Sequence, residues 1–213
     1  MYSQGSFENS APEVHAHDGL PKEVFLLKGP ESVQDFLDAK KDLAIGETSY
    51  PKGFDAQVKD AIDADVFFEC EVKSLTAWQE EACALSKALL SPFWSFMTAI
   101  EDHVPSRKRV LVKVVRDQMC PLFHVDKMFA RMIVTLSGTG TQWLQDKDIY
   151  RKNLNKGGKK PIIKPDSYLQ QILARQVAIL KGSRFSGSKG LVHRSPAVAP
   201  GSAPRLLVRV DYL

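Results

Sequence analysis

The stretch FHVDKMFARMIVTLSGTGTQWL, residues 123–144, combines a pronounced strand pattern with a short polar motif. Its β-branched and aromatic residues predict strands at 123–126 and 129–136, and the second strand ends at the Gly- and Thr-rich turn SGTGT. Alternate residues of a strand point to the same side of a sheet. We therefore expect His124 and Asp126, the two polar residues of FHVD, to face one cavity.

A second histidine adds to this motif. His193 lies in VHRSP, residues 192–196, 67 positions after Asp126 (193 − 126). Two imidazoles and one carboxylate form the facial triad that holds non-haem Fe(II) and leaves positions open for substrates, but Mn(II), Zn(II) and Ni(II) accept the same ligand types. The alternative is that the two histidines are unrelated, partly buried and hydrogen-bonded within the protein. The complete HxD…H arrangement favours the metal site.

Arginines follow the second histidine on a strand predicted at 205–211. Arg205 and Arg209 lie four positions apart, so they share one face with Leu207 between them. A guanidinium holds a carboxylate through two parallel hydrogen bonds, which suits a dicarboxylic co-substrate beside a metal. The alternative is a pair of surface charges on an edge strand. Arg131, on the strand at 129–136, is either a further carboxylate partner or a member of a buried ion pair.

Other polar residues flank the two motifs. Cys120 precedes His124 by four positions. It is either a fourth ligand, which would favour zinc, or a buried small apolar residue, and we favour burial. Arg194 and Ser195 either orient a ligand or are ordinary loop residues, and we favour the second interpretation. Three cysteines without CxxC spacing indicate neither a disulfide framework nor a zinc ribbon.

Composition limits the class of protein. A chain of 213 residues predicts a single domain at 23–213, preceded by a flexible tail at 1–22 in which His15 and His17 are read as solvated. The net charge of +4 comes from scattered basic residues, so no nucleic-acid partner is inferred. No apolar run approaches the roughly 20 residues of a membrane span. The polar N-terminus lacks the pattern of a secretory signal, so we expect a cytoplasmic protein.

The predicted elements divide the chain in two. Helical patterns occupy 31–41, 54–63 and 74–102, with a capping box expected at Thr76 and Gln79 and a break or kink at Pro92. Strand patterns follow at 109–115, 123–126, 129–136, 176–180, 190–193 and 205–211. This order predicts an α+β fold, or a β-sandwich or barrel, in which a helical buttress at 23–104 packs on a β-rich core at 105–213.

The second half of the chain, from about residue 110, resembles the double-stranded β-helix of Fe(II)/2-oxoglutarate-dependent oxygenases, a cupin- or jelly-roll-like fold. In that family an HxD on an early strand and a histidine on a late strand bind iron, and a basic residue after that histidine binds 2-oxoglutarate. The resemblance implies that His124, Asp126 and His193 hold Fe(II). It implies that Arg205 or Arg209 pairs with 2-oxoglutarate.

A closer resemblance is to the uncharacterised domain of unknown function 1826. Its members carry CPxFHxD, GTxWL and HRSP stretches, which match residues 120–126, 140–144 and 193–196. The genes of members often lie beside bacterial zinc-responsive metallochaperone genes, so this resemblance implies a link to metal supply.

These observations lead to three hypotheses. The first is a metal-dependent oxygenase of the Fe(II)/2-oxoglutarate type that acts on an unidentified small molecule or protein. The second is a non-catalytic zinc-binding protein of the same fold, linked to metal homeostasis, with Cys120 as a further ligand. The third is a structural β-domain whose histidines bind no metal.

Overall fold

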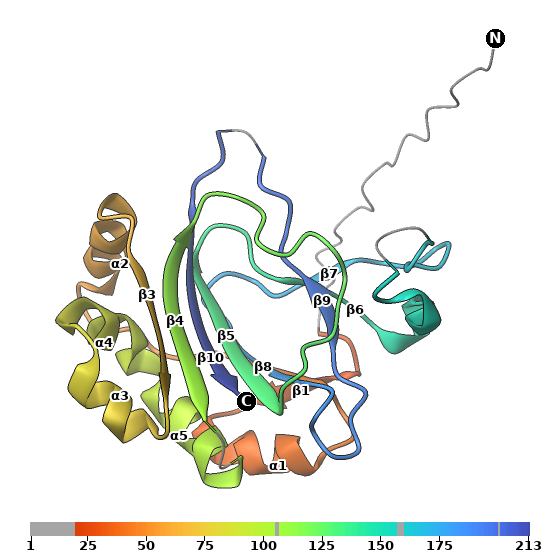
Figure 1. Cartoon of the computed structure of the whole chain (residues 1–213), viewed down its shortest axis with the longest axis horizontal. Coiled ribbons are helices and arrows are strands. Elements are labelled where there is room, and N and C mark those ends of the chain that lie inside the picture. The colour runs from red at the N-terminus through yellow and green to blue at the C-terminus, as the bar shows by residue number, and fades with distance from the viewer. Residues whose placement is uncertain (1–19, 105–106, 157–159, 200) are drawn as a thin grey trace.

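The computed structural model describes residues 20–104, 107–156, 160–199 and 201–213, and it contains two β-sheets and a layer of helices (Figure 1). The main sheet has seven strands in the order β1 (Val24–Leu27), β2 (Leu43–Gly46), β8 (Val177–Lys181), β5 (Ala130–Ser137), β10 (Arg205–Tyr212), β4 (Lys108–Val115) and β3 (Phe67–Val72). Only β1 and β2 pair in parallel; the other neighbours are antiparallel. The smaller sheet has the order β7 (Gln170–Gln171), β6 (Gln142–Leu144) and β9 (Val192–Arg194).

Helices cover one face of the main sheet, and the smaller sheet lies on the other side (Figure 1). The α-helices are α1 (Val33–Asp38), α2 (Phe54–Asp63), α3 (Leu75–Glu81), α4 (Ala84–Leu90) and α5 (Trp94–His103). Short 3-10 helices lie at η1 (Pro30–Ser32), η2 (Ser91–Phe93), η3 (Asp146–Asp148) and η4 (Arg151–Asn153). In the described part of the chain, no helix is both long and apolar enough to cross a membrane.

Alternation along β10 separates the two layers. Leu206, Val208, Val210 and Tyr212 pack into the core beneath the helices. Leu207, on the opposite face, packs against Trp143 of the smaller sheet. Since side chains alternate along a strand, Arg205, Arg209 and Asp211 share the face of Leu207. The predicted α+β fold is thus confirmed, and β10 presents its charged residues to the space between the sheets.

The predicted division of the chain needs one correction. The segment 23–104 is not only helical, because it also contributes β1, β2 and β3 to the main sheet. These strands are short and occupy the two ends of the sheet. Edge strands often carry charged residues, and Glu69 and Glu71 in β3 interrupt the apolar pattern that identifies a strand.

The helix predicted at 74–102 is divided into three. Ser74, not the predicted pair Thr76 and Gln79, caps α3, and its hydroxyl accepts a hydrogen bond from the backbone N–H of Ala77 at 3.2 Å. An extended backbone at Ala82 then ends α3. The break expected at Pro92 is confirmed, since η2 separates α4 from α5 there.

Gly140, in the GTQWL stretch, is packed too closely for any side chain. A Cβ atom built on it would overlap the backbone carbonyl of Ile172, beside β7. Because a backbone carbonyl cannot move as a side chain does, we expect Gly140→Ala to destabilise the protein by about 1–3 kcal/mol or more, as overpacking does. Thermal unfolding measures the effect. Thr139→Ala, at an exposed neighbour, is the control, and equal melting temperatures for the two variants would contradict the prediction.

Candidate metal and anion site

Three predicted ligands come together between the two sheets. One ligand atom from each of His124, Asp126 and His193 lies within 4.8 Å of the others. His193 belongs to β9, and His124 pairs with it through an isolated β-bridge in which each backbone N–H donates to the other residue's carbonyl at 3.0 Å. The strand predicted at 123–126 is therefore corrected to this single bridge, with Asp126 in the irregular chain that follows.

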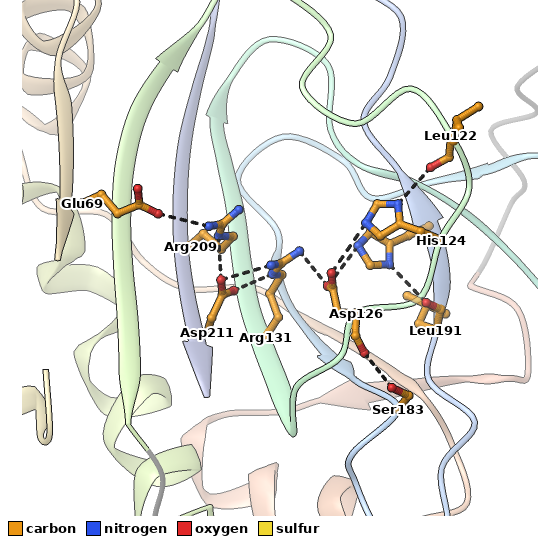
Figure 2. Close-up of polar contacts among 10 residues, drawn as sticks. Glu69, Leu122, His124, Asp126, Arg131, Ser183, Leu191, Arg209 and Asp211 are labelled. Carbon is orange, nitrogen blue, oxygen red and sulfur yellow. Dashed lines mark hydrogen bonds and ion pairs between the residues drawn. The ribbon is translucent and has the colours of Figure 1, made fainter. Parts of the chain in front are cut away.

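Backbone carbonyls orient both imidazole rings (Figure 2). Nδ1 of His124 lies 2.9 Å from the carbonyl oxygen of Leu122, and Nδ1 of His193 lies 3.2 Å from that of Leu191. A carbonyl only accepts hydrogen bonds, so each Nδ1 carries a hydrogen, and in the neutral ring Nε2 has its lone pair free. Histidines that bind a metal through one ring nitrogen typically donate the N–H of the other nitrogen to a carbonyl in this way.

The free nitrogens meet the carboxylate of Asp126. Nε2 of His124 lies 3.6 Å from Oδ1, and Nε2 of His193 lies 3.3 Å from Oδ2. Without a metal, a proton on Nε2 of either ring forms the hydrogen bond to Asp126. When both rings are neutral, the two Nε2 atoms and the carboxylate direct lone pairs toward one small region. Lone pairs repel one another unless a proton or a metal cation lies among them, so the donor set fits a divalent cation.

Asp126 is held in its charged form. Burial raises the pKa of its carboxyl group, but hydrogen bonding with His124 and His193 and the charge of Arg131 lower the pKa far below its usual range. Nη1 of Arg131 lies 2.7 Å from Oδ2. The hydrogen bond with Asp126 also raises the pKa of His124.

Arg131 belongs to a row of charges that crosses the main sheet (Figure 2). Its Nε and Nη2 donate to the two carboxylate oxygens of Asp211 at 2.6 and 3.1 Å. Asp211 also lies 3.1 Å from Nε of Arg209, whose Nη2 lies 3.6 Å from Glu69. Of the two interpretations of Arg131, the structure agrees with the buried ion pair. Arg209 is likewise shared between two carboxylates.

Arg205, the first residue of β10, differs from both of these arginines. Its side chain is buried, its Nε and Nη1 have no hydrogen-bond partner, and it forms no ion pair within the described ranges. Burial lowers its pKa to about 10. It lines a small cavity of about 30 Å³ together with His124 and His193. A buried cation without a partner is costly, so this position is suited to an anion.

The remaining predicted residues have structural contacts. Cys120 is exposed, so its predicted burial is wrong: the loop that carries it lies at the surface, and its thiol is not part of the three-ligand cluster. Arg194 donates from Nε to Gln142 at 2.8 Å and stacks on Phe123, and Ser195 donates its backbone N–H to the Cys120 carbonyl. His15 and His17 lie outside the described residues.

Asp211, like Glu69, is a member of the charge row that the sequence motifs did not identify. It is completely buried and contacts both Arg131 and Arg209. Its position in RLLVRVD, two residues after Arg209, places it on the same strand face and could have identified it.

Comparison with solved structures supports the fold. A prolyl-4-hydroxylase from Pseudomonas putida shares 9% identity and a TM-score of 0.51, covering 86% of this chain and 97% of the other. The dioxygenase for auxin oxidation 1 from Arabidopsis thaliana, in complex with 2-oxoglutarate, gives 12% identity, a TM-score of 0.43 and coverages of 89% and 91%. HygX from Streptomyces hygroscopicus, with nickel and 2-oxoglutarate bound, gives 11% identity and a TM-score of 0.45, and the match covers 88% of this chain and 86% of the other. The similarity to the prolyl-4-hydroxylase and the presence of two sheets both agree with the predicted double-stranded β-helix.

The family follows from the sequence itself. Residues 56–211 match DUF1826, a family described as proteins of unknown function. The match covers most of the chain, which therefore belongs to this family, as the three short motifs predicted. No curated protein matches the sequence.

Proposed function

We propose that this protein is an oxygenase of the Fe(II)/2-oxoglutarate type. The observation that carries the proposal is the position of Arg205, a buried and unpaired cation, in the same cavity as two histidines that converge on a carboxylate. Together these groups provide donors for a divalent cation and a binding partner for a carboxylate beside it. The similarity in fold to a prolyl-4-hydroxylase agrees with this assignment.

Each residue has a distinct part in the proposal. His124, Asp126 and His193 would hold Fe(II), and the carbonyls of Leu122 and Leu191 keep both rings turned toward it. Fe(II) with 2-oxoglutarate supplies the capacity to activate dioxygen and oxidise a C–H bond. Arg131 would keep Asp126 ionised and oriented.

Arg205 would bind the distal carboxylate of 2-oxoglutarate. Arg209 lines the same cavity but is already paired with Asp211 and Glu69, so it contributes less to this contact. The cavity of about 30 Å³ holds little more than water, and the co-substrate needs it to widen. Met119 lines the cavity, and an unbranched methionine side chain adapts readily.

Substitution of Arg205 tests the proposal. Anaerobic titration with Fe(II) and then 2-oxoglutarate should produce the weak visible charge-transfer band of the complex. In Arg205→Leu we expect unchanged Fe(II) binding but 2-oxoglutarate binding weakened on the order of tenfold to 100-fold, the loss of a charge-assisted contact. The control is Arg116→Leu, which removes an exposed arginine paired with Asp65.

Two outcomes would contradict the proposal. One is unchanged 2-oxoglutarate affinity in Arg205→Leu, which would show that this residue binds no co-substrate carboxylate. The other is tight zinc binding with no charge-transfer band. If Cys120→Ser then weakened zinc binding, the non-catalytic zinc-binding hypothesis would be favoured instead.

A further inference from the structure

A second cavity adjoins the metal and anion site. Its volume is about 300 Å³, the lower end of the range for pockets that bind small molecules. Its lining comes from two segments that are distant in the sequence: Cys120, Pro121, Leu122, Phe123, His124, Asn155, Lys156 and Ile162. We refer to it as the 120–162 pocket.

The 120–162 pocket lies directly against a proposed metal ligand. His124 and Cys120 line both this pocket and the small cavity that contains Arg205 and His193. A molecule in the pocket would therefore contact His124, whose Nε2 is directed at Asp126. The small cavity has a volume of only about 30 Å³, so it offers much less room for a molecule than the 120–162 pocket.

The chemistry of the walls is mainly apolar. Pro121, Leu122, Phe123 and Ile162 contribute hydrocarbon surface. Leu122 is 54% exposed although it is a large hydrophobic residue, and its carbonyl is held by the ring of His124. A solvent-facing apolar wall on a backbone that is fixed in this way is suited to the apolar part of a ligand.

The lining also carries a positive charge, on Lys156. Lys156 is exposed and forms no ion pair with any described residue, and Asn155 beside it offers an amide. Among the described residues that line the pocket, none is an aspartate or glutamate. The charge complementary to this pocket is therefore negative.

From these observations we propose that the 120–162 pocket binds the substrate, and that the substrate is a small molecule with an apolar body and an anionic group. The apolar body would lie against Leu122 and Ile162, next to His124, and the anionic group would pair with Lys156. The substrate role rests on the proposed oxygenase function, but binding to the pocket does not require a metal.

Calorimetric titration of the metal-free protein with octanoate tests the pocket, and octylammonium tests the charge. We expect octanoate to bind and octylammonium to bind at least about tenfold more weakly. Leu122→Asp and Lys156→Glu should each weaken octanoate binding on the order of tenfold or more. Lys152→Glu reverses the charge of an exposed lysine in η4 that does not line the pocket, and it should leave binding unchanged.

Arg205→Leu separates the pocket from the co-substrate site, and octanoate binding should survive this substitution. The proposal is overturned if octanoate does not bind, if octylammonium binds equally well, or if Arg205→Leu abolishes binding while Lys156→Glu does not. Adding octanoate to the anaerobic Fe(II)–2-oxoglutarate complex should shift the charge-transfer band, and an unchanged band would overturn the substrate role. If the band never forms but octanoate binds as described, the oxygenase assignment fails while the pocket assignment stands.

Discussion

Replacing His193 with alanine is expected to abolish the retention of Fe(II). His193 is almost completely buried on β9, and its Nε2 is one of three ligand atoms that lie within 4.8 Å of one another. Loss of a group that only hydrogen-bonds to a metal ligand already lowers metal affinity by about 10–100-fold. Removal of a ligand itself should therefore weaken Fe(II) binding by more than about 100-fold.

Metal content after anaerobic loading and desalting provides the measurement. His103→Ala is the matched control, because it removes an imidazole from the exposed C-terminal end of α5. Metal content should fall only in His193→Ala, while both variants keep the circular dichroism spectrum of the folded protein. Equal metal content in the two variants would remove His193 from the site and with it the basis of the oxygenase proposal.

Replacing Asp211 with alanine is expected to cause a large loss of stability. Its buried carboxylate contacts Nε and Nη2 of Arg131 and lies 3.1 Å from Nε of Arg209. Without it, two largely buried guanidinium groups lose their shared anion. Removing one partner of a buried ion pair costs about 3–5 kcal/mol. For a protein of this size that corresponds to a fall of roughly 6–20 °C in Tm.

Glu69→Ala is the control for this prediction. Glu69 contacts the same Arg209 at 3.6 Å but is 39% exposed, and such pairs contribute at most about 1 kcal/mol. Chemical denaturation of both variants gives the two free energies of unfolding. Similar losses in Asp211→Ala and Glu69→Ala would show that the buried row of charges contributes no more than a surface ion pair.

Much of the candidate site was predictable because its signals are local. The two-residue spacing of His124 and Asp126 placed them near one another, although the backbone there is irregular and not a strand. The same alternation predicted that Arg205 and Arg209 share a face, and both line the small cavity. These inferences needed only the period of an extended chain.

Other features were not predictable for physical reasons. Strands β1 and β2 have four residues each, which is too short for a periodic pattern. They are held in the sheet because β1 pairs with β2 and β2 pairs with β8. The end of α3 at Ala82 has no Gly or Pro to mark it. Cys120 was expected to be buried from the general behaviour of cysteine, but its exposure depends on the path of a loop through space.

The sequence by itself determined which side chains are available: two imidazoles, a carboxylate and a set of arginines at spacings that suit a metal and a dicarboxylate. Only the tertiary structure decided which arginine is free. Arg131 and Asp211 are opposite one another in the register of β5 and β10, and Arg209 reaches Glu69 across β4. Arg205, at the start of β10, has no acidic neighbour in the described sheet. Ion pairing depends on distances between strands that are far apart in the chain, and no local pattern encodes those distances.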